Sequence, residues 1–186
     1  MTVISNTSPL LNLALIERLH LIDAQFGEVV VPTAVWNELT AGFDGRDRID
    51  AFRDQGGIRV VSPELTDLRI EFERDPRERA KRVSVGPVAT VTERSERRVA
   101  TGTRSRRGAA IAYAIDIDAD RVLIDEREGQ ATTTRHDVPV TGVVGILLRA
   151  SDRGEVDLET ELDALREAGF WISDALYERA LEMDTE

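Results

Sequence analysis

The sequence predicts an α/β fold in which a parallel sheet carries helices on both faces. Two observations predict it. Short β-branched runs such as Val29–Val31, typical of strands buried on both faces, alternate along the chain with stretches of helical periodicity. Strands that alternate with helices are joined by right-handed crossovers, which make neighbouring strands parallel. The length of 186 residues suits one domain, so we expect residues 1–186 to fold together.

In the amino-terminal part, a strand is predicted at residues 3–5 and a helix follows it. Ser8 and Thr7 are predicted to cap this helix, with Pro9 at its first position. The alternative for both hydroxyls is a hydrogen bond to a metal ligand. Further predicted elements are a helix at 17–25, a strand at 29–31, helices at 32–39 and 46–55, a strand at 58–61 and a helix at 65–73.

In the carboxy-terminal part, an Ala-rich helix is predicted at residues 108–117. It is followed by a strand at 121–124, a turn and helix at 125–133, a strand at 138–140 and a helix at 143–150. Residues 157–186 are predicted to form two amphipathic helices, near 158–168 and 174–183. Phe170 and Trp171 are expected to anchor the last helix in the core or in a dimer interface.

Composition excludes several classes of site. The chain has no cysteine and two histidines, which excludes disulfides, thiolate zinc sites and His-rich metal clusters. Its apolar runs are too short to cross a bilayer and its first residues do not resemble a signal peptide, so we expect a soluble, cytoplasmic protein with no membrane role. The net charge is −11 and Lys81 is the single lysine among 24 basic residues. This composition favours a halophilic protein, whose surface charge says little about its partners.

Residues 74–107 form an Arg-rich segment that differs from the rest of the chain. It holds 11 basic and 4 acidic residues, so its charge is +7 and the remainder carries −18. Three interpretations stay open: an RNA-binding loop, a disordered insertion, or a passage translated out of frame. In the first, phosphates would be bound by six arginines, Arg94, Arg97, Arg98, Arg104, Arg106 and Arg107.

Polar residues follow three of the predicted strands. Asn6 follows the first strand, Glu38 lies on the helix after the second, and Asp125 ends the strand at 121–124. Ligands in parallel sheets bind just beyond the carboxyl ends of the strands. Oxygen donors of this kind suit Mg²⁺ or Mn²⁺, which can activate a water against a phosphodiester. The alternative is that these residues are helix caps and surface charges.

Five segments together resemble the PIN-domain family, in the branch of VapC-like toxins and predicted nucleic-acid-binding proteins. The similarity runs in the right order through residues 1–72 and 108–183. It is carried by residues 3–14 (Val-Ile-Ser-Asn-Thr-Ser-Pro-Leu-Leu-Asn-Leu-Ala), 29–39 (Val-Val-Val-Pro-Thr-Ala-Val-Trp-Asn-Glu-Leu), 112–126 (ending Leu-Ile-Asp-Glu), 141–150 (Thr-Gly-Val-Val-Gly-Ile-Leu-Leu-Arg-Ala) and 169–179 (Gly-Phe-Trp-Ile-Ser-Asp-Ala-Leu-Tyr-Glu-Arg).

The resemblance implies a three-layer sandwich with a five-stranded parallel sheet, and a Mg²⁺ or Mn²⁺ site that hydrolyses single-stranded RNA. The family's first acid falls on Asn6, its second on Glu38 and its late acid on Asp125, with support from Glu126 or Glu128. These residues are the implied catalytic and metal-binding set. The family's middle acid, which opens the Ala-rich helix, falls on Ala109, and an accompanying acid falls on Arg107. Two firm anionic ligands remain, and weaker metal binding is expected because affinity follows ligand charge.

Two hypotheses follow about function. The first is a toxin-type, metal-dependent endoribonuclease, impaired at its third acid. The resemblance also implies a small antitoxin partner and a homodimer. The second is a non-catalytic PIN-like module that binds RNA or a protein through the Arg-rich segment.

Overall fold

The sheet has five parallel strands. The computed structural model describes residues 1–42, 44–62 and 108–184. The strands are β1 (Val3–Ser5), β2 (Val29–Pro32), β3 (Ile58–Val61), β4 (Arg121–Leu123) and β5 (Val140–Thr141), and their order across the sheet is β3-β2-β1-β4-β5. Every pair of neighbours is parallel. The predicted fold class is therefore confirmed.

Within the described residues, helices follow β1, β2, β4 and β5, as predicted. The described helices are α1 (Thr7–Leu15), α2 (His20–Phe26), α3 (Thr33–Leu39), α4 (Arg46–Asp54), an unlabelled helix whose described part spans 108–116, α7 (Arg127–Arg135), α8 (Val143–Asp152), α9 (Leu158–Glu167) and α10 (Asp174–Asp184). The helix predicted at 65–73 and the Arg-rich segment 74–107 lie outside the described residues.

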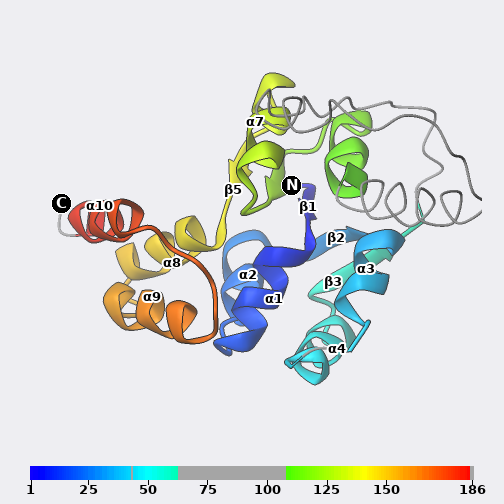
Figure 1. The fold of residues 1–186 in the computed structure, drawn as a ribbon. Helices are drawn as coiled ribbons and strands as arrows, with labels where there is room; N and C mark the ends of the chain where they lie inside the picture. The colour runs from blue at the N-terminus through cyan, green and yellow to red at the C-terminus, as the bar shows by residue number, and fades with distance from the viewer. Residues whose placement is uncertain (43, 63–107, 185–186) are drawn as a thin grey trace, which may run out of the picture.

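The direction in which the chain steps across the sheet places the helices in two layers. From β1 to β3 the chain moves one way, and from β4 to β5 it moves the other way. Right-handed crossovers then put α1–α4 on one face and the helix at 108–116 and α7 on the opposite face. Figure 1 shows these two groups on opposite sides of the sheet. A Cβ added at Gly129 of α7 would lie 2.2 Å from Ile124 and 3.2 Å from Ile111, which shows how closely this second layer packs.

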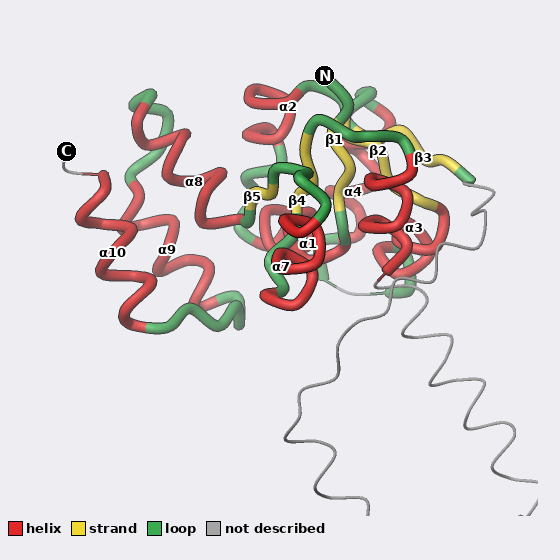
Figure 2. The backbone as a smooth tube through the Cα atoms, turned by 90° about the horizontal axis from the view of Figure 1, so that it is seen from above, coloured by secondary structure: helices red, strands yellow, loops and turns green. Residues whose placement is uncertain are grey.

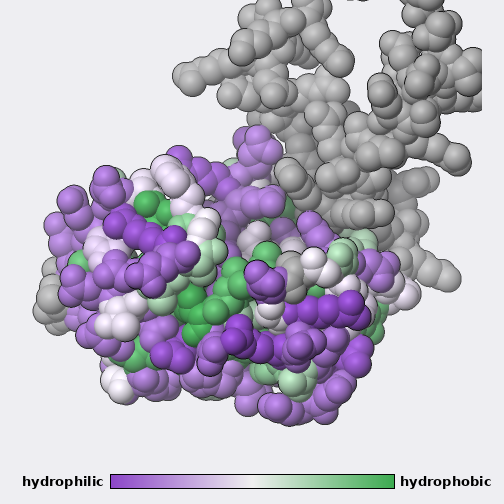
Figure 3. All heavy atoms as spheres, turned by 60° about the horizontal axis from the view of Figure 1, so that its bottom comes forward, coloured by the Kyte–Doolittle hydropathy of each residue, from purple (hydrophilic) through white to green (hydrophobic). Residues whose placement is uncertain are grey.

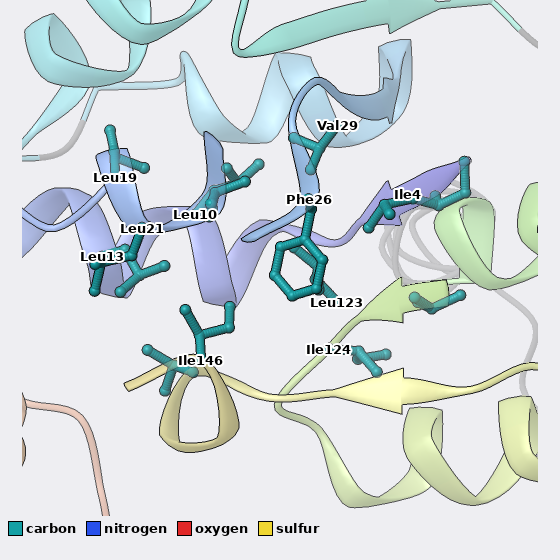
Figure 4. Close-up of a cluster of buried hydrophobic side chains, with 14 of the residues drawn as sticks. Ile4, Leu10, Leu13, Leu19, Leu21, Phe26, Val29, Leu123, Ile124 and Ile146 are labelled. Carbon is teal, nitrogen blue, oxygen red and sulfur yellow. The ribbon is translucent and has the colours of Figure 1, made fainter. Parts of the chain in front are cut away.

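The core is formed by β-branched strand residues and by leucines of the first helices. Val3, Ile4, Val29 and Val31 are inaccessible to solvent, as expected for strands covered on both faces. In Figure 4 side chains of α1, α2, β4 and α8 meet around Phe26. The apolar runs that predicted the strands are therefore the residues that join the helix layers to the sheet.

The carboxy-terminal helices form a group beside the sheet. Figure 2 shows α8, α9 and α10 together, next to the β5 edge. α8 packs against α2 and α1, and both α9 and α10 pack against α8. One ion pair ties this group to the amino-terminal part: Arg18 donates to Glu161 Oε1 from Nη2 at 2.8 Å and from Nε at 3.0 Å. Glu161 is 4% exposed.

Three local predictions differ from the structure. α1 begins at Thr7 with Asn6 as its N-cap and no side-chain cap hydrogen bond, so capping by Thr7 or Ser8 was wrong. α2 begins at His20 because Glu17 adopts a left-handed conformation with φ of 61°, which interrupts the helix predicted at 17–25. Trp171 is 77% exposed and lies before α10, so it does not anchor this helix in the core.

The described surface is largely hydrophilic. Figure 3 shows one face on which hydrophobic residues gather near the centre, surrounded by hydrophilic ones. The large hydrophobic side chains that are exposed among the described residues include Leu176 and Met183 of α10. Within the described ranges, no helix combines the length and the apolar character that a membrane span requires.

The Arg18–Glu161 pair provides a test of the packing between α9 and the amino-terminal helices. We expect Glu161→Ala to lower the free energy of unfolding by about 1–3 kcal/mol, because Arg18 loses its partner while keeping partial access to water. Glu167→Ala, at an exposed position of the same helix, is the control and is expected to change stability by less than about 0.5 kcal/mol. Chemical denaturation measures both, and equal effects would contradict the role of the pair.

Candidate metal centre

Asn6 lies at the end of β1 and beside β4, where the direction in which the chain steps across the sheet reverses. It follows β1 directly, and its backbone N–H donates to the carbonyl oxygen of Leu123 at the end of β4, at 3.0 Å. This hydrogen bond brings Asn6 close to Asp125, which lies two residues after Leu123. Asn6 is 2% exposed, and no hydrogen bond of its side chain is formed within the described residues. Asn6 therefore places a side-chain amide at the carboxyl edge of the sheet.

Glu38 reaches the same edge from α3. Its Oε2 accepts a hydrogen bond of 2.7 Å from the hydroxyl of Thr7, the first residue of α1 and the neighbour of Asn6. The Glu38 side chain is exposed, so its other oxygen stays accessible to a ligand. The Thr7 hydroxyl thus binds a carboxylate instead of capping α1. A hydrogen bond to a candidate metal ligand was the alternative considered for this hydroxyl.

Asp125 is held by two other elements. Its Oδ1 accepts from the backbone N–H of Val143, at the start of α8, at 2.6 Å. Its Oδ2 accepts from Asn12 Nδ2 of α1, at 3.3 Å. Gly142 makes this approach possible, since a Cβ at that position would lie 2.8 Å from Asp125 Oδ1. One carboxylate therefore joins the end of β4 to two helices.

Burial dominates the electrostatics of Asp125. Desolvation raises the pKa of its carboxyl group to about 6, against the lowering effect of the hydrogen bonds from Val143 and Asn12. The charge of Glu126 raises this pKa further, so Glu126 lies close enough to interact with Asp125. Glu128 is an exposed residue in the first turn of α7. Of the two supporting acids, Glu126 is thus the one with an observed interaction at the site.

The structure brings Asn6, Glu38 and Asp125 around the amino terminus of α1. Asn6 occupies the N-cap position of this helix, the Thr7 hydroxyl binds Glu38, and Asn12 further along the helix binds Asp125. Nothing further in the described ranges completes the set: no three Asp, Glu, His or Cys side chains there are grouped so as to hold a metal ion.

A small buried residue stands where the resemblance places the family's middle acid. Ala109 lies in the first described turn of the helix at 108–116 and is 4% exposed. The six candidate RNA-binding arginines lie outside the described residues: Arg94, Arg97, Arg98, Arg104, Arg106 and Arg107. A hollow lined by Glu17, His20 and Arg48 lies at the opposite end of α1 and takes no part in this centre.

Sequence reasoning missed two residues that position Asp125. Asn12 is a lone polar residue in the apolar run Leu10-Leu11-Asn12-Leu13, and it is only 8% exposed. A polar residue that is buried requires a hydrogen-bond partner, which was a usable signal. Gly142 carried a weaker signal, because glycine before a helix is also common without any close approach.

Comparison with known families identifies the family of the chain. The chain matches the DUF3368 family, described as a PIN domain, over residues 2–80 and 78–186. The chain belongs to the PIN-domain family. The two matched stretches meet inside the Arg-rich segment, at residues 78–80. No curated protein and no solved structure matches the chain significantly.

The donors of this PIN-domain chain fit a hard divalent cation. All three are oxygen atoms, two of them from carboxylates, and oxygen is the donor that Mg²⁺ and Mn²⁺ prefer. No basic side chain of the described residues forms an ion pair with Glu38 or Asp125. A cation would therefore supply a counter-charge to these two carboxylates. With two charges instead of three or four, we expect weak binding.

The raised pKa of Asp125 predicts a pH-dependent stability. Its pKa is about 6 in the folded chain against 3.8 unfolded, so the folded state binds more protons between these values. Stability therefore falls as pH rises from about 4 to 6, and the cost persists above 6. We expect Asp125→Asn, measured without metal, to be more stable than the wild type by roughly 2 kcal/mol at pH 7.5 and by much less at pH 4. Denaturation at both pH values tests this, and a pH-independent difference would contradict it.

Gly142 provides a separate test of how Asp125 is positioned. We expect Gly142→Ala to displace the carboxylate, because the new Cβ would overlap Oδ1. The affinity for Mn²⁺, measured by calorimetry, should fall at least fivefold, a loss of about 1 kcal/mol. Gly145→Ala in the same helix contacts only a methyl group of Thr141 and is the control. Equal affinities for the two variants would show that Gly142 does not position Asp125.

Proposed function

We propose that this PIN-domain chain is a metal-dependent endoribonuclease that cleaves single-stranded RNA slowly. The observation that carries the proposal is the meeting of Asn6, Glu38 and Asp125 around the amino terminus of α1. Family membership supports nuclease chemistry at this edge of the sheet. The low rate is inferred from the alanine at position 109, where the resemblance places a third carboxylate.

Each residue has a role in this proposal. Asn6, Glu38 and Asp125 would hold Mg²⁺ or Mn²⁺, with Glu126 as the nearest additional acid. Thr7 orients Glu38, and the Val143 N–H and Asn12 orient Asp125. A divalent cation in such a site supplies charge that polarises a phosphodiester and lowers the pKa of water. Because Asp125 carries its negative charge above its pKa of about 6, we place its metal-binding form at neutral and higher pH.

Cleavage of a labelled single-stranded RNA in Mn²⁺ tests the proposal. We expect slow cleavage by the wild type, its loss on chelation, and at least a hundredfold lower rate in Glu38→Gln and Asp125→Asn. Glu178→Gln removes an exposed carboxylate of α10 and is the matched control. Cleavage that survives both site substitutions would exclude this centre as the origin of the activity.

Ala109→Asp tests the reason given for the low rate. It restores a carboxylate at the position that the resemblance assigns to the middle acid. We expect tighter Mn²⁺ binding and faster RNA cleavage, since metal affinity increases with ligand charge. A larger Mn²⁺-induced rise in melting temperature than in the wild type would show that the new carboxylate reaches the metal. An unchanged rate with tighter metal binding would place the defect elsewhere.

A second candidate is a non-catalytic PIN-like module that binds RNA or a protein. The absence of a carboxylate at Ala109 favours it, because this leaves two anionic ligands. RNA binding that needs no metal, together with no cleavage in Mn²⁺, would support this alternative. The toxin role, a small antitoxin partner and a homodimer belong to the first proposal, and they rest on the resemblance to VapC-like chains.

A further inference from the structure

Two arginines lie together at the β4–β5 side of the sheet, and neither has an acidic partner among the described residues. Arg121 opens β4 and Arg149 lies in the second half of α8. The described residues place no carboxylate within 4.0 Å of either guanidinium. In a chain with 35 acidic and 24 basic residues, two half-buried arginines without an acid are unexpected.

Contacts around Thr141 bring the two arginines to the same place. Arg121 Nη1 donates to Thr141 Oγ1 at 2.6 Å, which directs its side chain along the neighbouring strand β5. The first turn of α8 lies over the same threonine, because a Cβ at Gly145 would be 3.2 Å from Thr141 Cγ2. Arg149 is four residues after Gly145 and therefore lies on the same face of α8. Figure 2 shows β4, β5 and α8 as neighbours.

Both guanidinium groups are restrained in this position. Arg121 is fixed by Thr141, and Arg149 lies over the ring of Phe26, 6.0 Å from its centroid. The pKa of Arg121 is lowered by burial and by the charge of Arg149, so the two charges repel each other. Repulsion of this kind is relieved when an anion binds between the groups. Arginine offers donors in a planar fork that matches the oxygens of a phosphate.

We propose that Arg121 and Arg149 bind a backbone phosphate of single-stranded RNA outside the metal centre. This inference rests on the proposed function, because it takes RNA as the substrate. The distance suits one chain that occupies both sites: Val143, which binds Asp125, precedes Arg149 by six residues, or about 9 Å along α8. Arg121 precedes Asp125 by four residues, or roughly 13 Å of extended chain. Thr141 positions Arg121 within this site.

Binding of a short single-stranded RNA to the full chain in EDTA tests the site without cleavage. We expect Arg121→Gln with Arg149→Gln to weaken binding about tenfold and to reduce the slope of log affinity against log salt by about 0.7, the value for one neutralised phosphate of a single strand. Arg179→Gln is the control, since it removes an exposed arginine of α10. Thr141→Val keeps the charge and should weaken binding less, with an unchanged slope.

The outcomes separate this inference from the proposed function. If the wild type cleaves RNA in Mn²⁺ but the double variant binds like Arg179→Gln, the phosphate site is wrong and the nuclease proposal stands. If neither the wild type nor any variant cleaves RNA in Mn²⁺ but RNA binding depends on Arg121 and Arg149, the phosphate site stands and the nuclease proposal fails. If inorganic phosphate binds as tightly as the RNA does, with both affinities expressed per phosphate group, RNA is not the ligand and the inference is overturned.

A folding control accompanies the double variant. Because the two arginines repel each other, their replacement should leave the melting temperature of the metal-free chain unchanged or higher. The double lysine variant, Arg121→Lys with Arg149→Lys, keeps both charges and should keep the wild-type salt slope while losing the planar fork. A lysine variant with the reduced slope of the glutamine variant would show disruption of the fold, and would overturn the inference.

Discussion

The position of the site depends on the pairing of β1 with β4 at the centre of the sheet. The chain steps from β1 toward β3 in one direction and from β4 to β5 in the other, so the helices that leave β1 and β4 cover opposite faces. Such a reversal opens a crevice at the carboxyl ends of the two strands. The hydrogen bond from Asn6 to Leu123 closes the pairing at this point. Asn6 and Asp125 are neighbours for this reason, although 119 positions separate their numbers.

The two carboxylates at this edge of the sheet have different environments. Glu38 is exposed and is fixed by one hydroxyl, whereas Asp125 is half-buried and accepts hydrogen bonds from two helices. The desolvation of Asp125 costs stability at neutral pH, and a cation is the partner that would offset this cost. The metal-free fold is thus less stable because of the site, as is common where function requires a buried charge.

The unequal charge of the chain has a counterpart in the structure. The described residues are strongly acidic, yet Arg121 and Arg149 lie together beside β5 with no acid between them. The Arg-rich segment 74–107 is a second concentration of positive charge in the sequence. RNA would meet an overall repulsive surface, so local groups of arginines are what the proposed function needs to bind phosphates.

The sequence by itself determined the alternation of strands and helices, because local periodicity reflects burial on both faces of a parallel sheet. It also located Asn6, Glu38 and Asp125 after their strands. Tertiary structure alone decided which groups meet. Thr7 and Glu38 are 31 positions apart, and Asn12 and Asp125 are 113 apart. Contacts at such separations depend on how helices pack, which no local pattern encodes, so Thr7 was expected to be a cap and Trp171 to lie in the core or in a dimer interface.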